Sequence, residues 1–266
     1  MLRVLNVGPL AVPVPEMLIL LGFWIGLELA ERHAYRYRID PARLYNLVFA
    51  GILAGLIGAR LVYAARSSAA FLENPLNLLA LSPQMLDPLG GLAFAALGAG
   101  AYALRKKMPL WPTLDALTSL FSALFVTFGL ANLASGAGFG APADLPWAID
   151  LWGERRHPTQ VYETLTALLI AAAVWPVTRI SRISEHPGVS GVNPSAKPGM
   201  RFLVFAALTA AARLVLESYR GDSTLVIGLF RQAQLVAWVV MAIGLWQIGR
   251  RLAVPAHTPV STTEEA

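Results

Sequence analysis

The chain has 266 residues, of which 56% are hydrophobic and only 14% are charged, and it carries a formal net charge of +5. Soluble domains contain about 25% charged residues, so this composition excludes an ordinary soluble domain and favours an integral membrane protein. Cysteine is absent, which excludes disulfides, thiolate metal ligands and a cysteine nucleophile within the chain.

Seven apolar stretches are long enough to cross a bilayer as helices, for which roughly 20 mostly apolar residues are needed. They lie at 16–31, 43–65, 88–104, 114–134, 160–178, 200–219 and 232–249. A helix satisfies its own backbone hydrogen bonds within lipid, so we predict an all-α integral membrane protein, a bundle of seven transmembrane helices. Residues 1–252 form a single transmembrane domain in this interpretation, and residues 253–266 form a disordered cytoplasmic tail.

Basic residues concentrate on one side of these stretches. They follow the first, third and seventh stretches and fill the connection between the fifth and sixth. Cytoplasmic loops carry an excess of Lys and Arg, so we predict an N-terminus outside and a C-terminus in the cytoplasm. The positive net charge is then a sign of topology and not of a nucleic-acid partner.

Local patterns predict how some of the helices begin and pack. In the second stretch, Gly51 and Gly55 are four residues apart and Gly58 follows, which predicts close packing against another helix. Asp87 and Asp115 stand just inside helix starts, where capping and complementation of the helix dipole explain them. We find no internal repeat of the kind that marks many transporters, so a transporter has little support.

Several polar side chains fall in the outer half of the predicted bilayer: Arg60, Asn132, Glu163, Arg213 and Glu217. Arg213, Glu217 and Arg220 are spaced to lie on one helical face. Charges inside membrane helices are costly and mark functional sites by default. Two interpretations remain open. One is internal ion pairing, Glu217 with Arg213 and Glu163 with Arg60. The other is an anion site with excess positive charge, suited to a phospholipid headgroup or a phosphate.

The fifth stretch opens with a dense polar segment, Arg-Arg-His-Pro-Thr-Gln-Val-Tyr-Glu, at 155–163. Proline suits the first helical position, so we predict a helix start at Pro158 with free N–H groups facing the outer site. His157 is a candidate proton carrier near neutral pH, or an interfacial helix cap. Tyr63, Tyr162 and Tyr219 are candidate donors to a phosphate, or residues of the aromatic belt.

Residues 157–163 (HPTQVYE) closely resemble the H-P-(S/T)-Q-x-Y-E motif of the bacterial prolipoprotein diacylglyceryl transferase family. Further blocks resemble that family's motifs in order: GARLVY at 58–63, GGLAF at 90–94, GAGFGAPADLPW at 136–147 and RLVLESYR at 213–220. The chain also departs from the family. Ala95 stands where the family has a histidine, Gly129 where it has an arginine, and Ala137 where it has a glutamate.

The resemblance implies transfer of diacylglyceryl from phosphatidylglycerol to the lipobox cysteine of a preprolipoprotein signal peptide, at the bacterial inner membrane. We expect no metal ion and no cofactor. Catalytic roles are implied for His157, Arg213 and Glu217. Substrate-binding roles are implied for Arg60, Tyr63, Asn132, Gln160, Tyr162, Glu163 and Arg220. The three departures leave a second interpretation open, a non-catalytic relative that binds phospholipid or lipoprotein signal segments.

Overall fold

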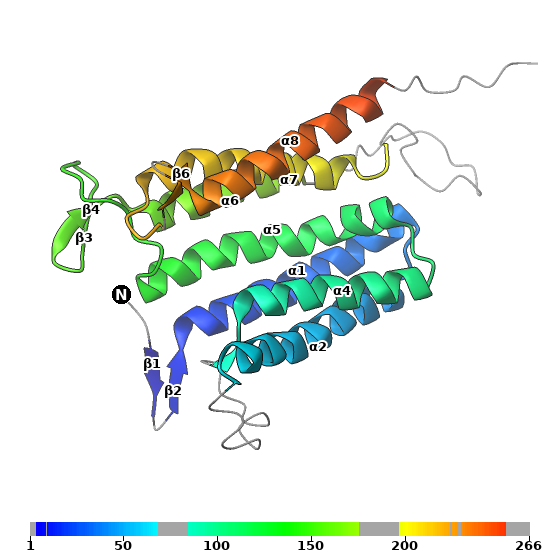
Figure 1. Ribbon diagram of the computed structural model, residues 1–266, viewed down its shortest axis with the longest axis horizontal. Helices are drawn as coiled ribbons and strands as arrows, with labels where there is room; N and C mark the ends of the chain where they lie inside the picture. Colours follow the sequence, from blue (N-terminus) through cyan, green and yellow to red (C-terminus); the bar gives the residue numbers. More distant parts are fainter. Residues whose placement is uncertain are drawn as a thin grey trace, which may run out of the picture. The chain divides into compact units, whose positions relative to one another are not determined.

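The computed structural model describes residues 4–8, 10–68, 85–175, 197–223, 225–227 and 230–253, and this part of the chain is mostly helical (Figure 1). Each predicted stretch coincides with one α-helix. The helices are α1 (Val14–Ala34), α2 (Pro41–Arg66), α4 (Pro88–Arg105), α5 (Leu110–Ser135), α6 (Thr159–Ala173), α7 (Met200–Leu216) and α8 (Gln232–Ala253). Two short 3₁₀ helices, η1 (Tyr35–Tyr37) and η4 (Glu217–Tyr219), follow α1 and α7.

Within the described residues, four helical segments are long and apolar enough to cross a membrane: α2, α5, α7 together with η4, and α8. α4 has 18 residues and α6 has 15, fewer than the roughly 20 that span a bilayer without help. The prediction of an all-α membrane protein is confirmed, whereas the number of seven spans and their orientation stay predictions. Residues 176–178 of the fifth stretch and 254–266 of the predicted tail lie outside the described residues.

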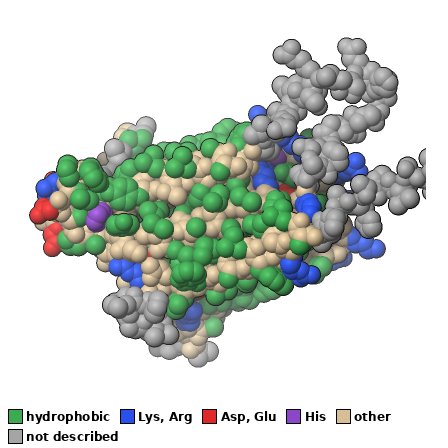
Figure 2. Space-filling view, turned by 90° about the horizontal axis from the view of Figure 1, so that it is seen from above, with side chains coloured by type: hydrophobic (Ala, Val, Ile, Leu, Met, Phe, Trp, Pro, Cys, Tyr) green, Lys and Arg blue, Asp and Glu red, His purple; other side chains and the backbone are tan. Residues whose placement is uncertain are grey.

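The helices carry large apolar side chains on their outer surfaces. Leu169 on α6 is 71% exposed, and Leu20, Leu104 and Val236 are exposed as well. Figure 2 shows hydrophobic side chains over most of the face in view. Exposing apolar surface to water costs about 25 cal/mol per Å², a cost that lipid removes. The surface is therefore that of a protein surrounded by lipid.

Among the described residues, three antiparallel hairpins, which the sequence did not predict, lie between or before the helices. They pair β1 (Val4–Val7) with β2 (Leu10–Pro13), β3 (Ile149–Leu151) with β4 (Glu154–Arg156), and β5 (Leu225–Ile227) with β6 (Phe230–Arg231). In the β3–β4 hairpin, Trp152 and Gly153 both have positive φ, +59° and +84°. Two such residues in succession form the tight turn whose twist matches antiparallel strands.

The chain forms two compact units. Unit 1 contains Met1–Gly26 and Leu120–Ala266, and unit 2 contains Leu27–Ser119. Helices α6, α7 and α8 belong to unit 1, and helices α2 and α4 belong to unit 2. The single transmembrane domain predicted over residues 1–252 stays a prediction.

In unit 2, helices α2 and α4 pack through small residues. A Cβ added to Gly55 would lie 3.0 Å from the Cβ of Ala95, and one added to Gly98 would lie 2.3 Å from the Cβ of Ala54. A Cβ on Gly58 would meet the side chain of Phe94. The predicted packing role is confirmed for Gly55 and Gly58, because the two helices approach too closely for larger side chains.

Asp87 holds the start of α4. Its Oδ1 accepts a hydrogen bond from the N–H of Gly90 at 2.6 Å, and its Oδ2 accepts one from Nη1 of Arg66 at 2.5 Å. The predicted N-cap is therefore confirmed at Asp87. The same prediction is wrong for Asp115, because α5 begins at Leu110 and carries Asp115 into its second turn, where it is 2% exposed.

Replacement of Asp87 by alanine is expected to lower the free energy of unfolding by about 1–2 kcal/mol, because the first turn of α4 loses its cap. Asp87→Asn should lose less, since an asparagine oxygen also caps. The measurement is the midpoint of thermal unfolding in detergent. Asp144→Ala is the control, because that carboxylate is 97% exposed and 3.6 Å from Arg155. Equal destabilisation by the two alanine variants would contradict the prediction.

In unit 1, α5 approaches α6 at Gly129. A Cβ added there would lie 2.4 Å from Oγ1 of Thr164 and 3.1 Å from its backbone nitrogen. Phe121 and Phe125 of α5 pack against a buried core formed by Ile170, Val174 and Phe205 of unit 1. The close contact brings the end of α5 beside the beginning of α6, where the predicted site residues lie.

Candidate active site

Three segments of unit 1 meet beyond the helix ends: the loop after α5, the residues before α6 and the residues after α7. The N–H of Ala141 donates to the carbonyl of Tyr219 at 2.8 Å, and the N–H of Gly221 donates to the carbonyl of Phe139 at 2.8 Å. The N–H of His157 donates to the carbonyl of Ala141 at 3.1 Å. These backbone bonds fix the three segments that carry the predicted site residues.

Two glycines allow the loop after α5 to approach its neighbours. Gly138 has φ +64°, and a Cβ there would lie 3.2 Å from Nη1 of Arg220 and 3.3 Å from Nδ2 of Asn132. A Cβ on Gly140 would lie 2.3 Å from the carbonyl oxygen of His157. The loop backbone therefore touches three of the predicted site residues directly, which a larger side chain would prevent.

An ionic cluster joins α6 to the end of α7. Oε1 of Glu163 accepts from Nη1 of Arg213 at 3.1 Å and from Nη1 of Arg220 at 2.7 Å. Oε2 of Glu217 lies 2.9 Å from Nε of Arg213 and 4.0 Å from Nε of Arg220. Asp222 accepts two hydrogen bonds from Arg220, at 2.9 and 2.8 Å. Three carboxylates thus surround two guanidinium groups, and the excess of positive charge expected from the sequence is wrong for this cluster.

Arg220 is the more buried of the two arginines, 12% exposed against 35% for Arg213. Burial opposes its charged form, but the charge of Glu163 and the hydrogen bonds to Asp222 and Glu163 outweigh it and raise the pKa of the guanidinium. Arg220 is therefore a fixed cation, and Arg213 is the arginine whose remaining N–H groups are open to a ligand.

His157 lies in an aromatic cluster. Its ring centroid is 5.2 Å from that of Tyr219 and 6.4 Å from that of Tyr162, whose hydroxyl accepts from Nε1 of Trp147 at 2.8 Å. Nδ1 of His157 is buried and has no hydrogen-bond partner among the described residues. No group among the described residues therefore competes for this nitrogen.

Thr159 and Gln160 at the start of α6 are fully buried and bind the loop after α5. Oγ1 of Thr159 donates to the carbonyl of Gly138 at 2.7 Å, and Nε2 of Gln160 donates to the carbonyl of Ala137 at 3.1 Å. These two bonds hold the loop in place beside the ionic cluster. A direct contact of Gln160 with substrate stays a prediction.

The start of α6 differs from the prediction. The helix begins at Thr159, one residue later than expected, and the N–H of Thr159 donates to the carbonyl of His157. The N–H groups of Val161 and Tyr162 both donate to the carbonyl of Pro158, at 3.0 and 3.2 Å. The bond from Tyr162 is the ordinary first bond of the helix. The prediction of free N–H groups at this helix start is therefore wrong for Thr159 and Val161, because the turn at Pro158 already uses their N–H groups.

Unit 1 brings together most of the predicted site residues: Asn132, His157, Gln160, Tyr162, Glu163, Arg213, Glu217 and Arg220. Arg60 and Tyr63 belong to unit 2, where Nη1 of Arg60 donates to the carbonyl of Met85 at 3.0 Å. The predicted pairing of Glu217 with Arg213 is confirmed. For Glu163, the structure provides Arg213 and Arg220 as partners, and the suggested pairing with Arg60 stays a prediction.

Two residues of the site had no assigned role in the sequence analysis. Asp222 accepts two hydrogen bonds from Arg220. Because Asp222 follows Arg220 by two residues in the sequence, this spacing could have suggested that the two side chains pair. Arg231 contacts the backbone 11 and 14 residues before it, at Arg220 and Glu217. No local pattern could have revealed Arg231, because β6 must fold back onto the end of α7 first.

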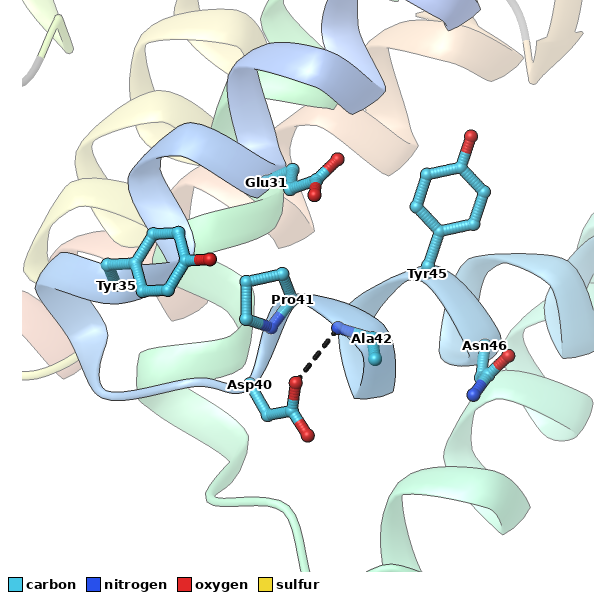
Figure 3. Close-up of a pocket in the computed structure, with 7 residues that line it drawn as sticks. All are labelled: Glu31, Tyr35, Asp40, Pro41, Ala42, Tyr45 and Asn46. Atoms are coloured by element: carbon cyan, nitrogen blue, oxygen red, sulfur yellow. Dashed lines mark hydrogen bonds between the residues drawn. The ribbon is translucent and has the colours of Figure 1, made fainter.

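A separate hollow of about 500 Å³ lies in unit 2 (Figure 3). Its lining is Glu31, Tyr35, Asp40, Pro41, Ala42, Tyr45 and Asn46. Oδ1 of Asp40 accepts from the N–H of Ala42 at 3.0 Å, so this carboxylate caps α2. None of the predicted site residues lines the hollow.

The chain is similar to known proteins over nearly its whole length. A family model described as prolipoprotein diacylglyceryl transferase matches residues 3–249. A protein of Nostoc sp., named phosphatidylglycerol–prolipoprotein diacylglyceryl transferase, is 26% identical over 96% of this chain and 92% of its own length. Proteins of the same name from Thermus thermophilus and Ruegeria pomeroyi are 28% and 29% identical, over 92% and 81% of this chain and 96% and 79% of their own lengths. Since the match spans nearly all of the sequence, the chain belongs to the prolipoprotein diacylglyceryl transferase family.

Proposed function

We propose that this chain transfers the diacylglyceryl group of phosphatidylglycerol to the thiol of a lipobox cysteine in a prolipoprotein signal peptide. The observation that carries the proposal is the convergence of Arg213 and Arg220 on Glu163, in a chain whose family match covers residues 3–249. The signal peptide provides the cysteine, so the absence of cysteine from this chain is compatible with the reaction.

The reaction exchanges one bond at a glyceryl carbon. The thiol loses its proton, the sulfur forms a thioether bond to that carbon, and the bond from the carbon to the phosphate oxygen breaks. Glycerol phosphate leaves with the electron pair of the broken bond. The protein must therefore help to remove a proton and must stabilise the phosphate that leaves. A positioned histidine can perform the first task, and oriented cations can perform the second.

We assign the proton to His157, because its Nδ1 has no hydrogen-bond partner among the described residues. We assign the leaving phosphate mainly to Arg213, because Arg220 is more buried and is already bound to Glu163 and Asp222. Glu217 orients Arg213 through the 2.9 Å contact to its Nε. The phosphate binds to the N–H groups of Arg213 that Glu163 and Glu217 leave open.

The remaining predicted residues are proposed as substrate contacts. In unit 1 these are Asn132, Gln160, Tyr162, Glu163 and Arg220, and in unit 2 they are Arg60 and Tyr63. The substrates are phosphatidylglycerol within the bilayer and the signal peptide with its lipobox cysteine.

We propose that the protein crosses the bacterial inner membrane seven times, with its N-terminus outside and its C-terminus in the cytoplasm. Basic residues after α1 and α4 and in the last turn of α8 support this orientation, among them Arg38, Lys106 and Arg251. Glu163 and Arg213 then lie in the outer half of the membrane, within reach of headgroups of the outer leaflet.

The test is direct. The purified protein, phosphatidylglycerol and a lipobox peptide are combined, and the diacylglyceryl peptide is measured by mass spectrometry. We expect product from the wild type. Arg213→Ala should reduce the rate by about 10²–10³-fold, because a group that stabilises developing charge is lost. His157→Ala should reduce it by about 10²-fold or more, the usual effect of a general base.

One set of observations favours a second function, a non-catalytic relative that binds phospholipid. Ala95, Gly129 and Ala137 stand where the resemblance implies a histidine, an arginine and a glutamate. Wild-type protein that binds phosphatidylglycerol but forms no product would establish this second function. Equal rates in Arg213→Ala and the wild type would overturn the role of the ionic cluster.

A further inference from the structure

Arg231, at the end of β6, reaches back to the end of α7. Its Nη1 donates to the carbonyl oxygen of Glu217 and to that of Arg220, the latter at 2.9 Å, and it lies 3.3 Å from Oγ of Ser223. Figure 1 shows β6 beside this end of α7. All three oxygens are neutral, so the role of Arg231 differs from that of Arg213 and Arg220, which bind carboxylates.

The carbonyl oxygen of Glu217 also accepts from the N–H of Arg220 at 3.2 Å, the bond that closes η4. The carbonyl of Arg220 follows the end of η4, where a helix leaves its last carbonyls to partners from outside the helix. α7 ends at Leu216, and η4 ends at Tyr219. The carbonyl groups at a helix end also carry partial negative charge, which a cation stabilises. One guanidinium group therefore satisfies the end of this helix and fixes the direction in which the chain continues.

The fixed backbone carries the side chains of the ionic cluster. Glu217 directs its carboxylate toward Nε of Arg213 at 2.9 Å, and Arg220 directs Nη1 toward Glu163 at 2.7 Å. Groups that are oriented before the reaction stabilise developing charge without a cost of reorganisation. Movement of the backbone at Glu217 or Arg220 would misdirect both contacts at once.

We infer that Arg231 is a positioning residue, which holds the backbone of Glu217 and Arg220 so that the paired arginines face the phosphate of the substrate. The identity of that phosphate rests on the proposed function, whereas the hold on the backbone does not. Neighbours that orient the groups of a site commonly affect activity about 10–100-fold when they are removed.

The experiment compares Arg231→Gln and Arg231→Lys with the wild type. Arg231→Gln should lower kcat for diacylglyceryl transfer about tenfold, which is the lower limit for neighbours that orient a site. Its KM for phosphatidylglycerol should change less, by under about threefold, because Arg231 does not contact the substrate. Arg231→Lys should recover much of kcat, since an ammonium can still donate to the two carbonyls. Arg250→Gln is the matched control, because Arg250 lies over the ring of Trp246 at the other end of α8. Its kcat should equal that of the wild type.

Hydrogen exchange of residues 217–223 gives a reading that does not need activity. Faster exchange in Arg231→Gln, with unchanged exchange in α2, supports the positioning role even if the wild type forms no product, a result that would overturn only the proposed function. Unchanged exchange at 217–223 overturns the inference. A kcat of Arg231→Gln equal to that of the wild type also overturns the inference. An equal loss of kcat in Arg231→Gln and Arg231→Lys, together with a lower unfolding midpoint in both, overturns it as well.

Discussion

Replacement of Glu163 by glutamine is expected to slow diacylglyceryl transfer by about 10²-fold and to lower the free energy of unfolding by about 3 kcal/mol. Glutamine keeps the shape of the side chain but removes the negative charge that Arg213 and Arg220 share. Both arginines are at least partly buried, so water cannot fully replace the lost carboxylate as the partner of their positive charges. The rate is measured with the lipobox peptide, and stability is measured by unfolding in detergent.

The matched control for this variant is Glu28→Gln. Glu28 also accepts from an arginine, Arg32, at 2.9 Å, but both side chains are exposed. An exposed ion pair contributes about 0–1 kcal/mol, so the control should unfold like the wild type. If Glu163→Gln retained both the transfer rate and the stability of the wild type, the ionic cluster would contribute to neither catalysis nor folding.

Replacement of Gly129 by arginine, the residue that the resemblance implies for the family at this position, is expected to destabilise the protein by about 3 kcal/mol or more and to add no activity. The first carbon of any side chain there would lie 2.4 Å from Oγ1 of Thr164 and 3.1 Å from its backbone nitrogen. A rotation of Thr164 could relieve the first contact, but only a separation of α5 and α6 could relieve the second. That separation would also displace Gln160 and Glu163.

The control is Gly249→Arg in α8, where an added Cβ meets nothing within 4 Å. This variant should be purified in wild-type yield and unfold at the wild-type midpoint. The measurements are the yield of monodisperse protein, the unfolding midpoint and the transfer rate. Faster transfer by Gly129→Arg than by the wild type would mean that the site lacks an arginine which the fold can still accommodate.

Two of the three positions at which the resemblance implies departures from the family lie at close helix contacts. Ala95 lies at the contact of α4 with α2, where its Cβ would be 3.0 Å from one on Gly55. Gly129 lies at the contact of α5 with α6. Because two helices approach closely at both positions, the packing around each of them favours a small residue.

The secondary structure could be predicted largely from local sequence. The stretches 88–104 and 232–249 became α4 (Pro88–Arg105) and α8 (Gln232–Ala253), which differ from the prediction by a few residues at most. Within lipid, the backbone groups of a long apolar segment must form hydrogen bonds with one another, so the apolar composition of the segment is enough to predict a helix. The hairpins were missed because strands of two to four residues are too short to show an alternating pattern.

The sequence by itself determined the class of protein, the helices and the family, because apolar length and the motif at 157–163 are properties of single segments. Only the tertiary structure decided the partners. Glu163 binds arginines that are 50 and 57 residues away, and Arg231 binds carbonyls 11 and 14 residues before it. Such pairs depend on how α6, α7 and β6 pack, and no local pattern specifies that packing. The sequence could name the charged residues, but the fold had to bring each one to its partner.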